Sequence, residues 1–136
     1  MDYETNILAR TLYGEANTEG LSGIEAIAAV IMNRIRYTQN GQLKGLGQTI
    51  PDVCRKPFQF SCWKTAEQSH KLMTADLSKD TIFAICCRVA TRAMKGLLPD
   101  IVNGATHYHS LDDHPRWASA LVPCAQIGHR LFYTCL

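Results

Sequence analysis

Apolar residues recur at helical spacing near the start of the chain. Ile7, Leu8, Thr11 and Leu12 fall on one face of a 3.6-residue repeat, which is typical of an amphipathic helix. The pattern predicts a helix from Glu4 to about Glu15.

A second segment, "SGIEAIAAVIMNRIRY", carries a longer apolar face. Ser22 and Glu25 have the spacing of a capping box, so a helix is predicted from Ser22 to about Tyr37. Its apolar face consists of Ile24, Ile27, Ala28, Ile31 and Ile35. Small residues on this face let another helix approach closely, so we expect it to be the central helix. Asn33 is expected to bond backbone across this helix, because an unpaired buried amide is costly.

Proline, glycine and aromatic residues punctuate the rest of the chain. Residues 38–48 are predicted to form a loop, and "PDVCRKPFQFSCW" (51–63) an irregular stretch that could line a groove. Helix signals return after Trp63 and after Ser78, which is predicted to cap a helix that stops at Gly96. Beyond Pro99, "GATHYH" and "HRLFYT" alternate as strands do, so a small hairpin or two extended segments are expected to pack on the helices. The sequence predicts an α+β, mainly α fold with a small extended/β portion near the C-terminus.

The composition is typical of one globular domain spanning residues 1–136, with 46% hydrophobic and 19% charged residues. Its net charge of +2 comes from 14 basic and 12 acidic residues mixed along the chain, unlike the basic stripe of a nucleic-acid binder. The longest apolar run, Ala26 to Met32, is far shorter than the roughly 20 residues of a membrane span. The N-terminus also lacks a secretory pattern. We therefore expect the chain to be cytoplasmic after synthesis.

Six cysteines occur, and none belongs to a CxxC pair, so a zinc ribbon or thioredoxin-like site is not expected. Most of them are expected to be small buried residues. Cys54 and Cys62 could form a disulfide in an oxidising compartment. The sequence leaves that pairing open.

One carboxylate stands in an unusual place. Glu15 comes where the first apolar helix ends, between the small residues Gly14 and Ala16, and a second acid, Glu19, follows four positions later. Cleaving a glycosidic bond needs a carboxylic acid that is still protonated near neutral pH, and a crowded apolar site favours that form. Glu15 is therefore a candidate general acid.

Five segments together resemble one protein family. "ARTLYGEANTEG", "GIEAIAAVIMNRI", "PFQFSCW", "NGATHYHSLDDHPRWA" and "IGHRLFY", in this order, are similar to the SleB/CwlJ family of bacterial cell-wall hydrolases. The resemblance implies a lysozyme-like catalytic domain that cleaves peptidoglycan, as in spore-cortex lytic enzymes and phage lysins. It places the catalytic acid at Glu15, with Glu19 as a possible supporting acid. Asn17 and Thr18 depart from the family's commoner "EARGE" pattern.

Aromatic residues in the same motifs suit a sugar polymer, which needs flat faces for its rings and polar groups for its hydroxyls. Phe60, Ser61 and Trp63 are predicted to form one wall of a groove. Tyr108 and Trp117 are predicted to form the other. Gln59 is a candidate hydrogen-bonding partner for substrate.

The carboxylates also suggest a mechanism. Hydrolysing glycosidases use two carboxylates, and only Glu15 is securely placed in the predicted groove. We therefore expect cleavage between N-acetylmuramic acid and N-acetylglucosamine by lytic transglycosylation, with Glu15 acting as acid and then as base. The alternative is a hydrolytic muramidase or glucosaminidase with a second carboxylate, Glu19 being the first to test.

Two other classes of protein remain open. His107, His109 and His114 in "HYHSLDDH" could ligate zinc in a metal-dependent cell-wall amidase, although no zinc-hydrolase signature accompanies them. A non-enzymatic saccharide-binding module would explain the aromatic residues but leave Glu15 without a role. We expect no cofactor and no metal.

The resemblance also bears on partners. The expected partner is the peptidoglycan glycan strand, with neither nucleic acid nor stable membrane insertion. A phage or prophage endolysin would accumulate in the cytoplasm and reach the cell wall with a holin-type permeabilising partner.

Overall fold

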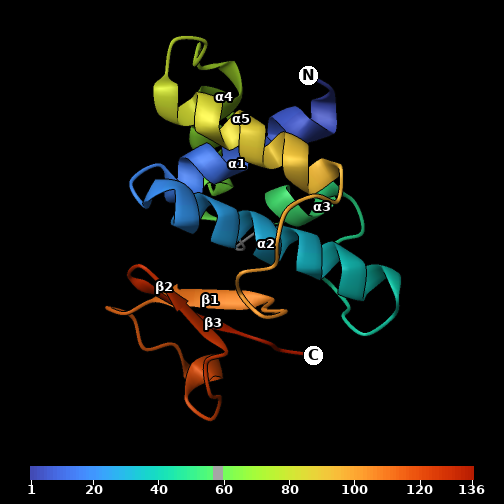
Figure 1. Cartoon of the computed structure of the whole chain (residues 1–136). Coiled ribbons are helices and arrows are strands. Elements are labelled where there is room, and N and C mark those ends of the chain that lie inside the picture. The colour runs from blue at the N-terminus through green and yellow to red at the C-terminus, as the bar shows by residue number, and fades with distance from the viewer. Residues whose placement is uncertain (57–59) are drawn as a thin grey trace.

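A computed structural model describes residues 1–56 and 60–136. The long helix α2 (Gly20–Gln39) lies across the middle of the molecule. Helices α1 (Tyr3–Ala16) and α5 (Thr81–Met94) pack on one side of it, and a small sheet lies on the other (Figure 1). The mainly helical α+β class is confirmed.

Helix α1 forms where the apolar repeat predicts it. The Asp2 carboxylate accepts a hydrogen bond of 2.8 Å from Thr5 N and caps the first turn. Ile7, Leu8 and Leu12 are completely buried, and burying an aliphatic side chain of this size is worth about 1.5–3 kcal/mol. The helix end that carries Glu15 is therefore fixed to the core.

Helix α2 begins two residues before Ser22, so the predicted capping box is wrong. Gly20 has a φ of +72°, a left-handed conformation that glycine adopts without steric cost. It lies at the turn between α1 and α2. Glu19 is the N-cap, and its side chain makes no capping hydrogen bond. The Glu25 carboxylate instead forms an ion pair with α5, with Oε2 3.8 Å from Arg92 Nη1.

The middle of the chain is more regular than its composition suggests. The segment predicted to be irregular contains α3 (Ile50–Arg55) and a short 3-10 helix, η1 (Ser61–Trp63). Helix α4 (Ala66–Thr74) follows, with a capping box made by Thr65 and Gln68. Asp80 rather than Ser78 caps α5, because its carboxylate accepts hydrogen bonds from Ile82 N and Phe83 N.

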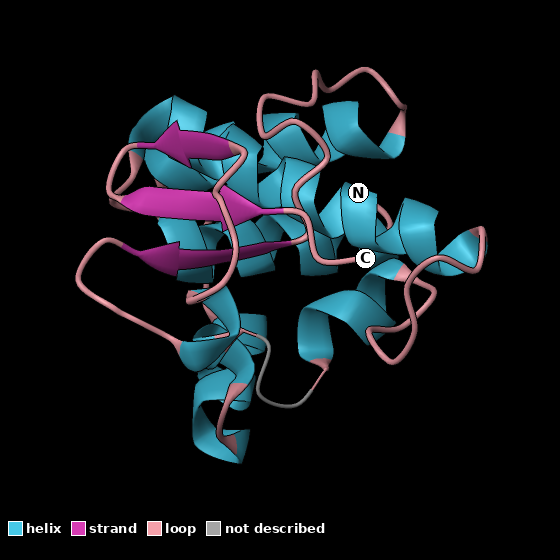
Figure 2. Cartoon of the chain, turned by 90° about the horizontal axis from the view of Figure 1, so that it is seen from below, coloured by secondary structure: helices cyan, strands magenta, loops and turns pink. Residues whose placement is uncertain are grey.

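The C-terminal part forms a three-stranded antiparallel sheet (Figure 2). Its strands are β1 (His107–Ser110), β2 (Ala125–Ile127) and β3 (Arg130–Tyr133), with β3 between the other two. The short 3-10 helix η2 (Arg116–Ala118) lies between β1 and β2 along the chain. Both predicted extended segments are confirmed, and β2 adds a strand that the sequence did not reveal.

Two neighbouring side chains of α2 join the helices to this sheet. Asn33 Nδ2 donates hydrogen bonds to Ala105 O at 3.0 Å and to Asp100 Oδ2 at 3.3 Å. Arg34 Nε donates to Thr106 O at 2.6 Å. These carbonyls lie immediately before β1, so α2 determines where β1 begins.

All six cysteines carry free thiols. Cys54 and Cys86 are buried, and burial raises the pKa of each of these two thiols to about 12. The Cys54–Cys62 disulfide left open by the sequence is not formed. Within residues 1–56 and 60–136, no helix combines the length and the apolar character that a membrane crossing needs.

The Asn33 contacts give a stability prediction. Asn33→Ala leaves Ala105 O without its buried donor, so we expect the free energy of unfolding to fall by about 1–3 kcal/mol. Urea denaturation followed by circular dichroism measures this change. Asn40→Ala, at the exposed end of the same helix, is the matched control and should change it by less than about 0.5 kcal/mol. An equal effect of both substitutions would contradict a bridging role for Asn33.

Candidate active site

A groove of about 880 Å³ opens between the end of α1, η1 and the sheet. A groove of this size suits an extended ligand. The predicted site residues that line it are Glu15, Phe60, Ser61, Tyr108 and Trp117. The structure thus brings together residues from four separate parts of the chain.

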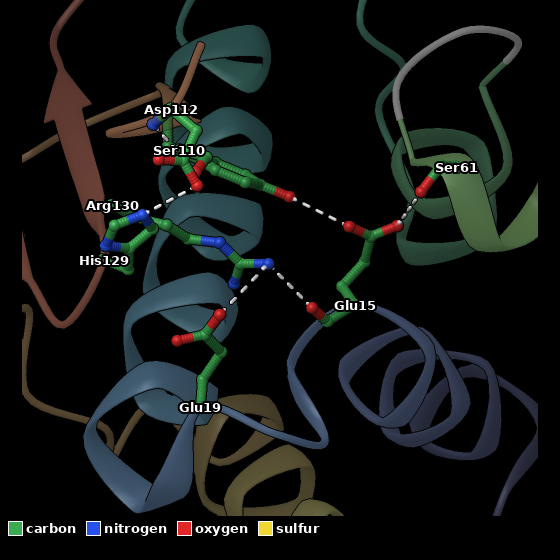
Figure 3. A network of polar contacts seen from close by, with 8 residues as sticks. Glu15, Glu19, Ser61, Ser110, Asp112, His129 and Arg130 are labelled. Atoms are coloured by element: carbon green, nitrogen blue, oxygen red, sulfur yellow. Dashed lines mark hydrogen bonds and ion pairs between the residues drawn. The ribbon is translucent and has the colours of Figure 1, made fainter.

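Glu15 lies where these parts meet. Its Oε1 accepts hydrogen bonds from Cys62 N at 3.2 Å and from Ser61 Oγ at 3.4 Å. Its Oε2 accepts one from the Tyr108 hydroxyl at 3.4 Å. Figure 3 shows the carboxylate between Ser61 and the sheet. All three hydrogen bonds are long, at 3.2–3.4 Å. Long hydrogen bonds are weak, so the carboxyl group can exchange them for contacts with a ligand.

The glycine beside Glu15 has a steric role. A Cβ at Gly14 would lie 2.5 Å from Cys62 Cβ and 2.9 Å from Cys62 Sγ, much closer than van der Waals contact. Only glycine lets η1 approach α1 closely enough for Cys62 N to reach Glu15. Ala16, on the other side of Glu15, is completely buried. The small neighbours of Glu15 therefore reflect close packing at the helix end.

Arg130 holds the same helix end from the sheet side. Its Nη2 donates a 2.8 Å hydrogen bond to Glu15 O, one of the carbonyls that a helix C-terminus leaves unpaired. Its guanidinium carbon lies 5.3 Å from the centre of the Tyr108 ring, a cation–π arrangement. The sequence pattern predicts no role for Arg130, although the "IGHRLFY" motif contains it.

Glu19 does not line the groove with Glu15. Its Oε1 is 3.8 Å from Arg130 Nη2, and Figure 3 shows its carboxylate facing Arg130 while that of Glu15 extends toward Ser61. Glu19 thus contacts the guanidinium that holds the backbone of Glu15. Its geometry suits a positioning role better than direct contact with substrate.

The predicted aromatic walls are only partly correct. Trp63 does not line the groove. Its indole is buried in the core, where Nε1 donates a 2.9 Å hydrogen bond to Thr11 Oγ1. Phe60 lines the groove with a buried ring, while Trp117 is 42% exposed. Gln59 lies outside the described residues.

Trp117 is held at the rim by edge contacts. Its ring centre lies 5.3 Å from that of Tyr133 and 5.7 Å from that of His109. It also lies 5.6 Å from the ring of His107. These contacts hold the indole in place while 42% of the residue's surface stays exposed.

The three histidines do not form a metal site. Both ring nitrogens of His109 are engaged, Nδ1 with Ser110 O at 2.7 Å and Nε2 with the Tyr133 hydroxyl at 2.8 Å. His114 does not line the groove that contains His107 and His109. No group of three metal-binding side chains is found in the described part of the chain.

Burial shifts the pKa values of several groups in the groove, and two of them, His107 and Tyr108, bear on its chemistry. Burial, reinforced by the positive charge of Arg34, lowers the pKa of His107 to about 4, so its imidazole is neutral near pH 7. His107 Nδ1 is 2.8 Å from Thr106 Oγ1. Burial, with a smaller contribution from the negative charge of Glu15, raises the pKa of Tyr108 well above its usual value. The phenol of Tyr108 therefore keeps its proton and acts as a donor.

Known proteins support this description. A family model described as Cell Wall Hydrolase matches residues 18–133, so Glu15 lies just before the matched range. The catalytic domain of the germination-specific lytic transglycosylase SleB from Bacillus anthracis is 21% identical, with a TM-score of 0.74 over 98% of this chain and 96% of that chain. The catalytic domain of the Bacillus cereus SleB protein is 20% identical, with a TM-score of 0.73 over 96% of this chain and 89% of that chain. No curated protein matches the chain. The resemblance to the SleB/CwlJ family and its lysozyme-like fold are confirmed.

The contact at Gly14 gives a second prediction. We expect Gly14→Ala to destabilise the protein by about 1–3 kcal/mol through overpacking, in spite of the roughly 1 kcal/mol that alanine gains in helix propensity. In a Cys62→Gly background the two closest atoms are absent and the 3.2 Å contact with Leu72 Cδ2, at the end of a flexible side chain, is left, so the same substitution should cost clearly less. Urea denaturation of the four proteins in this double-mutant cycle measures the coupling. If Gly14→Ala costs the same in both backgrounds, the steric explanation is wrong.

A third prediction concerns His107. Its folded-state pKa of about 4 lies below the ordinary value of 6.5, so between these values the unfolded chain binds the proton more tightly. The free energy of unfolding must therefore fall as the pH falls through this range. We expect His107→Gln to lose less stability than the wild type between pH 7.5 and pH 4.5, measured by urea denaturation at both values.

The exposed His70 offers the matched control for this measurement. His70→Gln should keep the wild-type dependence on pH. An unchanged pH dependence in His107→Gln would show that the shift at His107 does not contribute.

Proposed function

The chain belongs to the cell wall hydrolase family and is a peptidoglycan-degrading enzyme, and we propose that it cleaves the glycan strand between N-acetylmuramic acid and N-acetylglucosamine with Glu15 as general acid and base. The observation that carries this proposal is the position of the Glu15 carboxylate in the groove, in contact with Ser61, Cys62 and Tyr108. A carboxyl group held from two sides has the fixed orientation that proton transfer requires. Its substrate would enter along the groove.

The groove offers suitable surfaces for a glycan. Trp117 presents an exposed indole at one rim, and Ser61 and Ser110 add hydroxyl groups to the lining. An apolar ring face with a few polar groups is the usual composition of a sugar-binding surface. We propose that the strand lies across Trp117 with its scissile bond at Glu15.

The contacts of Glu15 favour a two-step role. In the first step the protonated carboxyl group gives its proton to the glycosidic oxygen, and that C–O bond breaks. The resulting carboxylate can then accept hydrogen bonds from Ser61 Oγ, Cys62 N and the Tyr108 hydroxyl. In the second step it takes the proton of the muramoyl 6-hydroxyl, whose oxygen bonds to the anomeric carbon and forms a 1,6-anhydro ring. Glu15 thereby regains its proton, and no water is consumed.

The other acids bear on the choice between transglycosylation and hydrolysis. Hydrolysing glycosidases place two carboxyl groups about 5–5.5 Å or 6.5–9.5 Å apart. Among the described residues that line the groove, the acid besides Glu15 is Asp113, which is exposed. Glu19 faces Arg130, and Asp112 is engaged with His129 at 2.9 Å. This arrangement favours lytic transglycosylation, with a hydrolytic muramidase or glucosaminidase as the second candidate.

The fourth prediction tests the acid and the products together. We expect Glu15→Gln to lower the rate of release of soluble fragments from purified sacculi by at least about 10²–10⁴-fold, the usual contribution of a general acid or base. Glu19→Gln should lose less, because Glu19 acts on Glu15 only through Arg130. Mass spectrometry of the wild-type products should find 1,6-anhydromuramic acid ends.

Circular dichroism and sedimentation with sacculi provide the controls, since both variants should remain folded and bind sacculi. Ordinary reducing ends would instead indicate hydrolysis, and Glu19 and Asp113 would then be tested as the second carboxylate. Full activity of Glu15→Gln would exclude the proposed role of this residue.

The biological setting stays a prediction. The endolysin and bacteriophage assignment and the holin-type partner are proposals from the resemblance alone, and the cytoplasmic location after synthesis stays an untested prediction.

A further inference from the structure

Two positively charged side chains lie under the groove with unused donors. Among the described residues, three polar side-chain atoms are buried without a hydrogen-bond partner: Arg34 Nη1, Arg130 Nη1 and Thr38 Oγ1. Both arginines line the groove. Buried guanidinium groups normally have their donors satisfied, so these two nitrogens need an explanation.

The buried charge of Arg34 costs more free energy of folding than that of Arg130. It is 4% exposed, and within the described residues no carboxylate lies within ion-pair distance of it. Its Nε donates a hydrogen bond to Thr106 O, and its guanidinium carbon lies 5.3 Å from the centre of the Phe60 ring. A guanidinium remains charged even when buried, and an uncompensated buried charge costs several kcal/mol. A function that uses this charge would explain why the cost is tolerated.

Arg130 carries its charge to the same part of the groove. Its Nη2 donates a 2.8 Å hydrogen bond to Glu15 O and lies 3.8 Å from Glu19 Oε1. Its Nη1 has no hydrogen-bond partner among the described residues. Both arginines act on the Tyr108 phenol, because burial and Glu15 raise its pKa whereas Arg130 and Arg34 lower it. The Tyr108 hydroxyl is therefore within electrostatic range of both guanidinium groups.

The other charged groups of the groove do not cancel this positive charge. Lys64 adds a third cation, and the acids in the described lining are Glu15 and Asp113. When Glu15 carries the proton required of an acid, Asp113 is the remaining negative charge among these lining residues. The groove ready for catalysis therefore attracts an anion.

We propose that Arg34 and Arg130 form a binding site for a carboxylate carried by the muramoyl residue of the glycan strand. Arginine is well suited to this ligand because its fork of N–H groups matches the two oxygens of a carboxylate. This inference rests on the proposed function, since it names the part of the glycan that the groove recognises. N-acetylglucosamine has no carboxylate, so the site would distinguish the two alternating sugars and set the strand in register with Glu15.

Peptidoglycan offers this carboxylate from two sources. One is the lactyl carboxylate of a muramoyl residue that carries no stem peptide. The other is a carboxylate of the stem peptide itself, because peptide attachment converts the lactyl carboxylate to an amide. Free N-acetylmuramic acid presents the first source, and muramoyl dipeptide presents the second.

The experiment measures binding of small ligands to the Glu15→Gln protein by NMR chemical-shift titration. We expect N-acetylmuramic acid or muramoyl dipeptide to bind at least 10-fold more tightly than N-acetylglucosamine, and the tighter of the two identifies the source. Arg34→Gln and Arg130→Gln, each in the Glu15→Gln protein, should reduce this preference to less than about 3-fold. Raising the salt concentration should weaken it as well.

Matched variants separate recognition from structural damage. Arg36→Gln removes an exposed arginine two residues further along α2 and should keep the full preference. Arg34→Lys keeps the charge and should retain part of the preference, so it remains informative if Arg34→Gln does not fold. Circular dichroism of each variant establishes folding.

Two results overturn the proposal. In the first, the Glu15→Gln protein with both arginines shows no preference, because the three ligands bind equally or none binds. In the second, the preference survives both arginine substitutions. These outcomes are independent of cleavage, because the titration uses an inactive protein. If the Glu15→Gln protein with both arginines shows no preference while the wild type cleaves sacculi in a Glu15-dependent way, the carboxylate site alone is rejected. Active Glu15→Gln protein would reject the proposed function instead.

Discussion

The position of the sheet depends on the hydrogen bonds from two adjacent side chains of α2. Asn33 and Arg34 donate to the carbonyls of Ala105 and Thr106, the two residues that precede β1. Each bond is buried, and a hydrogen bond from a charged group is worth about 1.5–3 kcal/mol. Since β1 supplies Tyr108 to the groove, these bonds also set the distance between the groove wall and Glu15. The fold and the site therefore share one structural support.

The site itself is assembled from the ends of elements. Glu15 is in the last turn of α1, Cys62 belongs to a single 3-10 turn, and Arg130 is the first residue of β3. Element ends have unpaired backbone groups, and the site uses them: Cys62 N donates to the Glu15 carboxylate, and Glu15 O accepts from Arg130. Separate segments thus fix the backbone and the side chain of Glu15. A general acid needs this degree of orientation.

The sequence predicts the parts of this architecture that depend on local patterns. The apolar repeats locate α1, α2 and α5 closely, because helix burial follows a 3.6-residue period. Helix starts are less accurate: a left-handed Gly20 begins α2 before Ser22, and Asp80 takes the capping role expected of Ser78. Five of the residues selected from the family motifs lie in one groove: Glu15, Phe60, Ser61, Tyr108 and Trp117.

Tertiary contacts account for what the sequence does not reveal. Trp63 and Phe60 look alike as aromatic residues of one motif, but the hydroxyl of Thr11 holds the indole of Trp63 in the core. Arg130 reaches a carbonyl 115 positions earlier in the chain, and Arg34 one 72 positions later. No local spacing encodes such contacts.

The charges of these arginines also constrain how a glycan can react in the groove. Positive charge develops at the anomeric carbon as a glycosidic bond breaks, and a nearby cation opposes it. Arg34 and Arg130 both act electrostatically on Tyr108, which contacts Oε2 of Glu15, whereas Ser61 and Cys62 contact Oε1. A carboxylate bound by the arginines would neutralise part of their charge on the Tyr108 side of Glu15. Recognition of the muramoyl residue and cleavage beside it would then be coupled electrostatically, because a strand without this carboxylate must form its cationic transition state near Arg34, whose charge has no ion-pair partner among the described residues.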